Sequence, residues 1–320
     1  MVKALNEALR QSLAEDPRML VLGEDIGKLG GVFRVTDGLQ DEFGAERVFD
    51  TPLAEAGIAG VSLGLALAGW HPVAEMQFDG FSYPALDQVI SHIAKYRFRS
   101  RGRQTVPLVI RIPYAGGVGA AEHHSESPEA YYAHTSGLKV VTPSSPIDAY
   151  HLLRASIADP DPVIFFEPKS RYWSKEEGEL GRDGALPIGS SRIVREGSDC
   201  TIVAYGAMVA RSLQAATKAS ERGVDVEVVD VRSLVPLDLD ALARSVRKTG
   251  RAVVVHEAPM TAGFGAEIVA RIMEDAFDYL EAPVLRVTGY DIPYPPATIE
   301  SNYVPSVDRI LAAIDRVRTY

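Results

Sequence analysis

The sequence is poor in cysteine, in long apolar runs and in surplus positive charge. Its one cysteine, Cys200, cannot form an internal disulfide, which favours a reducing compartment. No stretch approaches the ~18 apolar residues that a transmembrane helix needs, and the first ten residues predict an amphipathic helix rather than a signal peptide. The net charge of −10 argues against nucleic acid as the main partner. We therefore expect a cytoplasmic protein without membrane or nucleic-acid partners.

The length of 320 residues, with 46% hydrophobic and 24% charged residues, fits a soluble protein of two domains. Short apolar runs alternate with helical patterns, which predicts α/β units with largely parallel sheets. The first domain should span residues 1–175, a polar linker residues 176–190, and the second domain residues 191–320. Strands are predicted at residues 19–23, 73–78, 108–112, 138–142, 163–167, 201–205, 226–231 and 252–256.

The turn at residues 50–55 enters a predicted helix that is unusually rich in glycine. Thr51, followed by proline, suits the N-cap position. Glu55 lies one residue beyond the capping-box position, so a first-turn acid that complements the helix dipole is the simplest alternative. Glycine recurs at about one-turn spacing, at Gly57, Gly60 and Gly64. Because each glycine costs roughly 1 kcal/mol relative to alanine, we expect a close packing partner on this helix. A carboxylate at such an apolar start should have a raised pKa, which suits proton transfer near neutral pH.

Ligands on open parallel sheets bind at the carboxyl ends of strands. That rule selects Glu24, the turn at residues 77–81 and the segment from Tyr114 onward. A nicotinamide-dependent dehydrogenase would need Gly-x-Gly-x-x-Gly directly after a strand. The segment Gly263-Phe-Gly265 lacks the third glycine, so this class is disfavoured.

Residues 50–60, Asp-Thr-Pro-Leu-Ala-Glu-Ala-Gly-Ile-Ala-Gly, resemble a motif of the β subunits of 2-oxo acid dehydrogenases, the E1 components of lipoyl-linked complexes. The resemblance continues in order at residues 74–78, 84–88, 94–100, 123–130, 137–141, 164–168, 249–251, 256–258 and 286–291. It covers effectively the whole chain. It implies a thiamine-diphosphate pyrimidine-binding domain, with a parallel sheet flanked by helices, followed by a transketolase C-terminal-like α/β domain. The implied activity is oxidative decarboxylation of a 2-oxo acid with reductive acylation of lipoyl groups on the E2 acyltransferase.

The resemblance also implies roles for individual residues. Glu55 would hydrogen-bond N1′ of the aminopyrimidine ring of thiamine diphosphate. His124, after a glycine-rich segment, would contact the substrate and protonate the lipoyl disulfide. The other implied cofactor-binding residues are Glu24, Leu53, Ala54, Gln77 and Phe81, where Phe81 replaces a frequent tyrosine. The implied substrate-binding residues are Phe78, Asp79, Gly80, Phe81 and His124.

The wider family of these enzymes holds diphosphate through Mg²⁺ with a Gly-Asp-Gly motif, which this sequence lacks. A self-sufficient transketolase-like enzyme is therefore disfavoured. The resemblance instead implies an α subunit that holds Mg²⁺ and diphosphate, in an α2β2 assembly with cofactors at α–β interfaces. It further implies a possible structural K⁺ at Leu108, Val109, Ser156, Asp159 and Asp161, although Val109 replaces a threonine of some relatives.

The substrate class is suggested by residues 76–87 and 94–100, which resemble branched-chain 2-oxo acid dehydrogenases more closely than pyruvate-specific ones. We therefore expect a 2-oxoisovalerate-type substrate, with pyruvate or acetoin enzymes as alternatives. A non-catalytic assembly subunit is the alternative from another class, and it would leave Glu55 and His124 free to vary. The alternating cations and aromatics of residues 95–103 favour a solvated or subunit-interface surface over a nucleic-acid site.

Overall fold

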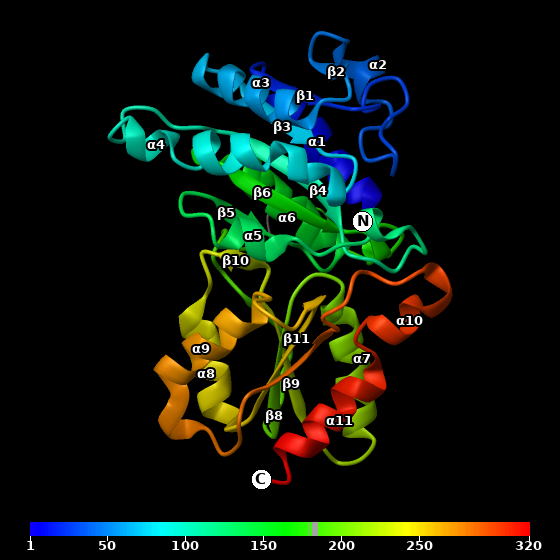
Figure 1. Cartoon of the computed structure of the whole chain (residues 1–320), viewed down its shortest axis with the longest axis vertical. Coiled ribbons are helices and arrows are strands. Elements are labelled where there is room, and N and C mark those ends of the chain that lie inside the picture. Colours follow the sequence, from blue (N-terminus) through cyan, green and yellow to red (C-terminus); the bar gives the residue numbers. More distant parts are fainter. Residues whose placement is uncertain (179, 181–184) are drawn as a thin grey trace.

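The computed structural model describes residues 1–178, 180 and 185–320. Two α/β domains lie one above the other along the long axis of the molecule, as Figure 1 shows. The predicted linker, residues 176–190, falls partly outside the described residues. No helix in the described part of the chain is both long and apolar enough to span a bilayer.

The N-terminal domain is built on a seven-stranded sheet with the order β10-β5-β6-β4-β3-β1-β2. Neighbours from β5 to β2 pair in parallel, which matches the predicted class. Its strands are β1 Met19–Gly23, β2 Val48–Asp50, β3 His71–Glu75, β4 Val109–Tyr114, β5 Lys139–Val141 and β6 Val163–Pro168. The last strand, β10 (Ser233–Val235), comes from the C-terminal half of the chain and pairs antiparallel with β5.

Helices cover both faces of this sheet. On one face, α1 packs against α6, and their apolar side chains join those of β1 in one buried cluster. On the other face, α3 and η2 bury apolar side chains against alternate positions of the same strands. The N-terminal helices are α1 Val2–Glu15, α2 Leu39–Phe43, α3 Glu55–Leu67, η1 Gly80–Ala85, η2 Gln88–Ile93, α4 Tyr96–Arg99, η3 Glu122–His124, α5 Glu129–Ala133, α6 Pro146–Ile157 and η4 Lys169–Arg171.

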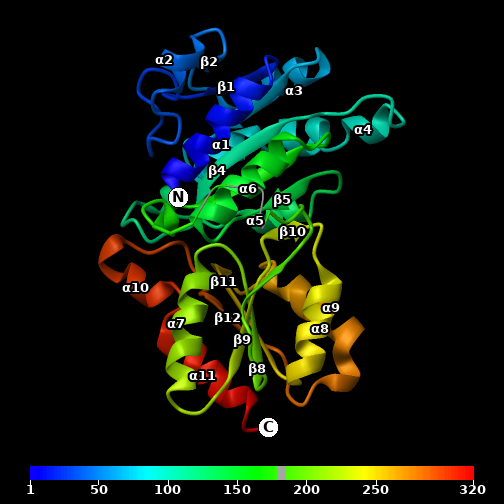
Figure 2. The same cartoon turned by 180° about the vertical axis from the view of Figure 1, so that it is seen from behind.

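The C-terminal domain has a five-stranded sheet with the order β12-β11-β8-β9-β7. Its strands are β7 Arg192–Arg195, β8 Cys200–Ala204, β9 Val226–Asp230, β11 Ala252–Pro259 and β12 Leu285–Gly289. Helices α7 and α11 lie on one side of the sheet and α8 and α9 on the other (Figures 1 and 2). The helices are α7 Met208–Ser220, α8 Leu239–Thr249, α9 Gly265–Ala276, η5 Phe277–Tyr279, η6 Ala297–Ile299, α10 Glu300–Tyr303 and α11 Val307–Val317.

The predicted start of α3 is wrong. The helix begins at Glu55 with Ala54 at the N-cap position, and no side chain caps it. The backbone N–H of Thr51 donates instead to the carbonyl of Gly23 at 2.9 Å, so Thr51 continues the edge of the sheet. The following proline also disfavours a helical conformation at Thr51. By contrast, Ser145 caps α6, because its side-chain oxygen accepts from the backbone N–H of Asp148 at 3.4 Å.

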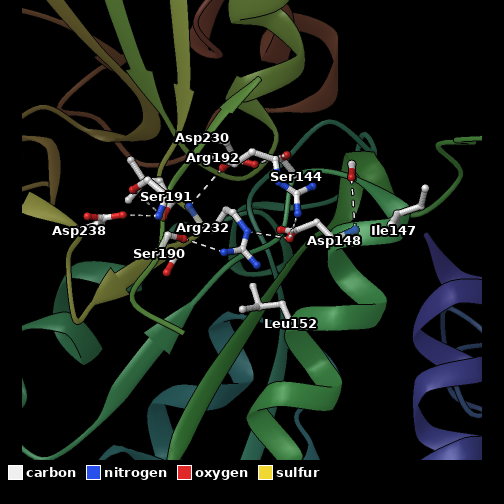
Figure 3. Close-up of polar contacts among 12 residues, drawn as sticks. Ser144, Ile147, Asp148, Leu152, Ser190, Ser191, Arg192, Asp230, Arg232 and Asp238 are labelled. Carbon is white, nitrogen blue, oxygen red and sulfur yellow. Dashed lines mark hydrogen bonds and ion pairs between the residues drawn. The ribbon is translucent and has the colours of Figure 1, made fainter. Parts of the chain in front are cut away.

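A buried polar cluster joins the two domains where β9 turns into β10 (Figure 3). Arg232, fully buried with a positive φ of 58°, donates to Asp148 at 2.7 Å and to the carbonyl of Ser190 at 2.6 Å. Ser144 donates to Asp230 at 2.5 Å. Burial raises the pKa of Asp230 to about 7, and the charge of Asp148 adds to the rise. These contacts fix the start of α6 to the corner that leads into β10.

Candidate active site

The candidate site lies at the carboxyl edge of the N-terminal sheet. The ends of β1, β2 and β3 are level there, because Gly23 is in register with Asp50 on one side and with Glu75 on the other. Glu24 follows β1, Glu55 begins the helix after β2, and Gln77 follows β3. The strand-end rule therefore selected residues that the fold brings to one edge.

Glu24 and Glu55 form a pair of carboxylates at this edge. Both side chains are buried, and the Oε1 atom of Glu24 has no hydrogen-bond partner. Burial, the charge of Glu55 and the charge of Asp25 all raise the pKa of Glu24. An unpartnered buried oxygen is costly unless a donor reaches it, so this pair has the chemistry to receive a ring nitrogen or amino group of a ligand.

The surface beside this pair is open and apolar. Leu53 is 80% exposed, and Ala54 is exposed as well. None of the three glycines of α3 has a neighbour within the described residues that a Cβ would crowd. A Cβ at Gly64 would have no neighbour within 4 Å, one at Gly57 would meet only the Cβ of Ala54 at 3.6 Å, and one at Gly60 would make an ordinary contact with Gln88 at 3.6 Å. Val61, on the same helix, is 55% exposed. This face of α3 thus has no close partner in the described chain.

His124 lies among aromatic rings from the turn after β3. Its ring centroid is 4.2 Å from that of Phe78 and 5.0 Å from that of Phe81. Its Nδ1 atom is buried without a hydrogen-bond partner, whereas His123 is exposed. Burial, together with the charges of His123 and Lys169, lowers the pKa of His124. The lowered pKa favours the neutral imidazole near pH 7.

Asp79 and Gly80 support this arrangement rather than face the open edge. Asp79 is fully buried, where it pairs with Lys169 and accepts from the backbone N–H of Glu126 at 2.6 Å. A Cβ at Gly80 would overlap the carbonyl oxygen of His123. These contacts bring the turn at residues 77–81 against the segment that carries His124.

The two groups of predicted residues form one continuous rim. Gln77 donates to Asp25 at 2.8 Å, which connects the turn after β3 to the turn that carries Glu24. Phe78 and Phe81 continue the rim towards His124. Sequence reasoning missed Asp25, Glu126 and Lys169. Lys169 directly follows β6, and Asp25 is the second residue after β1. The strand-end rule, applied to every strand, would therefore have selected both.

The predicted potassium residues lie near the amino ends of β4 and β6, away from this edge. They are brought together, since the N–H of Val163 donates to Leu108 and that of Asp161 donates to Asp159 at 2.9 Å. The carboxylates, however, already have cationic partners: Lys139 contacts Asp159 at 2.6 Å, and Arg97 contacts Asp161 at 2.5 Å. The carboxylates are thus already neutralised, so a K⁺ in this region would depend on backbone carbonyl oxygens for its ligands.

Comparisons with known proteins define the class of this fold. Residues 1–174 match the transketolase pyrimidine binding domain, and residues 189–310 match the transketolase C-terminal domain. A solved split-gene transketolase, named an inactive β4 tetramer, has a TM-score of 0.82 and 25% identity over 99% of this chain and 97% of its own. The chain is therefore a two-domain transketolase-like protein of the thiamine-dependent class.

Relatives define the family more narrowly. The pyruvate dehydrogenase E1 component subunit beta of Leifsonia xyli is 57% identical over 100% of this chain and 95% of its own. The 3-methyl-2-oxobutanoate dehydrogenase subunit beta of Mycobacterium tuberculosis is 54% identical over 99% of this chain and 91% of its own. A 2-oxoisovalerate dehydrogenase subunit beta of Dictyostelium discoideum is 48% identical over 100% and 86%. The chain belongs to the E1 β subunits of 2-oxo acid dehydrogenases, and the predicted resemblance is confirmed.

Proposed function

We propose that this chain is the β subunit of a branched-chain 2-oxo acid dehydrogenase E1, active in the cytoplasm as an α2β2 assembly with an α subunit. The assembly would decarboxylate branched 2-oxo acids and transfer the acyl group to lipoyl groups of an E2 acyltransferase. The observation that carries the proposal is the Glu24–Glu55 pair at an open sheet edge, joined by one rim to the aromatic surroundings of His124. This arrangement disfavours the alternative of a non-catalytic assembly subunit.

The residues at the edge fit thiamine diphosphate. When bound, this cofactor supplies the carbon nucleophile and accepts the electron pair that decarboxylation releases. Glu55 would hold a proton between its carboxylate and N1′ of the aminopyrimidine, and Glu24, with its unpartnered oxygen, would accept from a nearby donor. Leu53, Ala54 and Phe81 would form the apolar surroundings of the ring. His124 would position the substrate in its neutral form, and after it takes up a proton the imidazolium would donate that proton to the lipoyl sulfur.

Two observations support an incomplete site in the single chain. The sequence has no Gly-Asp-Gly, so Mg²⁺ and the diphosphate would be held by the α subunit. The small, apolar face of α3, with exposed Leu53 and Val61, offers the surface on which such a partner could close the edge. The split-gene transketolase with a similar fold, described as an inactive β4 tetramer, supports the same reasoning for a related chain.

The apolar walls of the rim support a branched substrate. Phe78 and Phe81 flank His124, and their rings are 5.8 Å apart between centroids. An isopropyl group against them gains more from burial than a methyl group, although one or two methylenes contribute only ~1–3 kcal/mol to discrimination. Pyruvate is the second candidate, because the relative at 57% identity is a pyruvate dehydrogenase subunit.

Co-expression with an E1 α chain tests the proposal. The purified assembly should decarboxylate 3-methyl-2-oxobutanoate with a higher kcat/KM than pyruvate, in a reaction that requires thiamine diphosphate and Mg²⁺. The chain alone should show no turnover. Turnover by this chain alone would contradict the half-site proposal, and a higher kcat/KM for pyruvate would reassign the substrate.

We further propose that K⁺ has a structural role only. It would bind at Leu108, Val109, Ser156, Asp159 and Asp161. An ion that binds the folded state but not the unfolded one stabilises the fold by RT ln(1 + [ion]/Kd) and so raises the melting temperature. Replacement of K⁺ by choline at constant ionic strength should then lower the melting temperature of the assembly. An unchanged melting temperature would remove K⁺ from the description.

A further inference from the structure

The segment that carries His124 makes a second set of contacts, with the C-terminal domain. Residues 115–126, here called the histidine loop, leave the end of β4 and return to the same place, because the N–H of Ala115 donates to the carbonyl of Glu126 at 2.8 Å. His124 lies near the end of this loop, in η3. Since the two ends of the loop are joined, the position of His124 depends on the contacts that the residues between these ends make.

Two amides at the start of the histidine loop donate to carboxylates of the C-terminal domain. The N–H of Gly116 donates to Glu257 at 2.6 Å, and the N–H of Gly117 donates to Glu300 at 2.8 Å. The hydroxyl of Tyr294 donates to the same oxygen of Glu300 at 2.8 Å. Glu257 belongs to β11, and Glu300 begins α10, which lies on the side of the C-terminal domain that faces the N-terminal domain (Figure 1).

The two glycines allow this close approach. A Cβ at Gly116 would overlap the phenol ring of Tyr294. Gly117 has a φ of +86°, which favours glycine, and a Cβ there would lie 2.7 Å from the Cβ of Ser170. Hydrogen bonds from backbone N–H groups to ionised carboxylates are roughly twice as strong as bonds between neutral groups. The contacts are thus specific to these glycines and these acids.

We propose that Glu257 and Glu300 are positioning residues for His124: by binding the amides of Gly116 and Gly117, they fix the histidine loop against the rim of the active site. The inference rests on the proposed function of His124. It assigns the C-terminal domain a direct influence on the acyl-transfer step, through a loop that the N-terminal domain also holds at its base, at the Asp79 contact and at the rings of Phe78 and Phe81.

Separate assays of decarboxylation and of acyl transfer to the lipoyl group distinguish this positioning role from a general effect on folding. Decarboxylation measured with an artificial electron acceptor needs the Glu55 edge and the substrate held by His124. Transfer to a lipoyl domain needs His124 twice, to hold the substrate and to donate a proton. Loss of a carboxylate contact should therefore lower the lipoyl-dependent rate more than the artificial-acceptor rate. A fall in stability alone would lower both rates together.

Glu300→Ala is the first variant to measure, because this side chain is only partly buried. In the α–β assembly, amide exchange at Gly117 should become about ten- to a hundredfold faster, the range that one charge-assisted hydrogen bond supports. The lipoyl-dependent rate should fall by a similar factor, while the rate with the artificial electron acceptor dichlorophenolindophenol should fall by less. Glu300→Gln keeps an acceptor oxygen and should restore most of both protection and rate.

Glu281→Ala is the matched control, since this carboxylate of the same domain pairs with Arg251 at 2.6 Å and is largely exposed. It should change neither exchange in the histidine loop nor either rate. Glu257→Gln repeats the test at the buried contact: it keeps volume and an acceptor but removes the charge, so exchange at Gly116 should rise less than exchange at Gly117 rises in Glu300→Ala.

Wild-type exchange across residues 115–126 in Glu300→Ala, with wild-type rates for both acceptors, would overturn the positioning role. Equal losses of both rates would overturn it as well, because they indicate a general effect. Failure of the proposed function has a different signature: the wild-type assembly would then turn over no 2-oxo acid. In that case the exchange measurement still decides whether the two carboxylates fix the loop.

Discussion

The buried ion pair of Asp79 and Lys169 allows a quantitative test of how much this contact stabilises the fold beside the active site. Both side chains are fully buried, and Asp79 has one further partner, the N–H of Glu126 at 2.6 Å. Lys169→Met keeps the length of the side chain and leaves the carboxylate without its cation. Removal of one partner of a buried pair costs about 3–5 kcal/mol of unfolding free energy. For a domain of this size, the melting temperature should fall by about 6–20 °C.

The loss should depend on pH. Burial raises the pKa of Asp79 to about 6 in the wild type, and Lys169 opposes the rise, so the pKa should be higher still in Lys169→Met. A carboxyl group with a raised folded pKa contributes its full stability below its unfolded value of about 3.9 and loses it as the pH rises through the folded pKa. The variant should therefore be closest to the wild type near about pH 5 and least stable above about pH 7.

Thermal unfolding followed by circular dichroism measures both effects. The double variant Asp79→Asn/Lys169→Met removes both charges and should be more stable than Lys169→Met alone. Lys139→Met is the control: its partner Asp159 lies at a similar distance of 2.6 Å, but the two side chains are 29% and 13% exposed. Such a pair contributes about 0–1 kcal/mol. If Lys169→Met lost no more stability than Lys139→Met, or lost the same amount at every pH, the reasoning from burial would be refuted.

Four further variants test the site residues. Glu55→Gln keeps size but cannot exchange a proton, so decarboxylation should fall about 100- to 10,000-fold while size-exclusion chromatography shows intact assembly; near-normal turnover would exclude the role. His124→Ala should lower the lipoyl-dependent rate more than proton exchange at the reactive carbon of thiamine, as NMR can follow. Gly80→Ala should destabilise the fold by about 1–3 kcal/mol through overlap with His123, which calorimetry would detect. Gly64→Ala should stabilise the isolated chain by up to about 1 kcal/mol yet weaken its binding to the α subunit; unchanged affinity would place the partner elsewhere.

Local sequence patterns predicted those helices and strands that are determined by residues close together in the sequence. Strand 19–23 has the predicted bounds, because a short apolar run defines it. The start of α3 was wrong because a long-range backbone bond draws Thr51 to Gly23, which no local rule contains. The family and the fold class needed only ordered motifs, and the comparisons confirm both.

The residues of the candidate site could be predicted from the sequence, but their long-range partners could not. The strand-end rule and the resemblance selected Glu24, Glu55 and Gln77, which the fold places on one edge. They did not reveal that Asp79 faces a buried lysine 90 positions later in the chain, or that Gly116 contacts Glu257 across 141 positions. Such pairs depend on tertiary packing, and a single sequence carries no periodicity or spacing that would connect them.

The contribution of β10 to the N-terminal sheet sets an order of events during synthesis. A nascent chain that has emerged only as far as residue 175 must leave the edge of β5, at Lys139–Val141, without its antiparallel neighbour. An unpaired strand edge is a template for association with other chains. The first domain is therefore completed only after Ser233–Val235 has left the ribosome, although domains usually fold as they emerge. Separate production of the two halves, split at the linker, would carry the same exposed edge permanently.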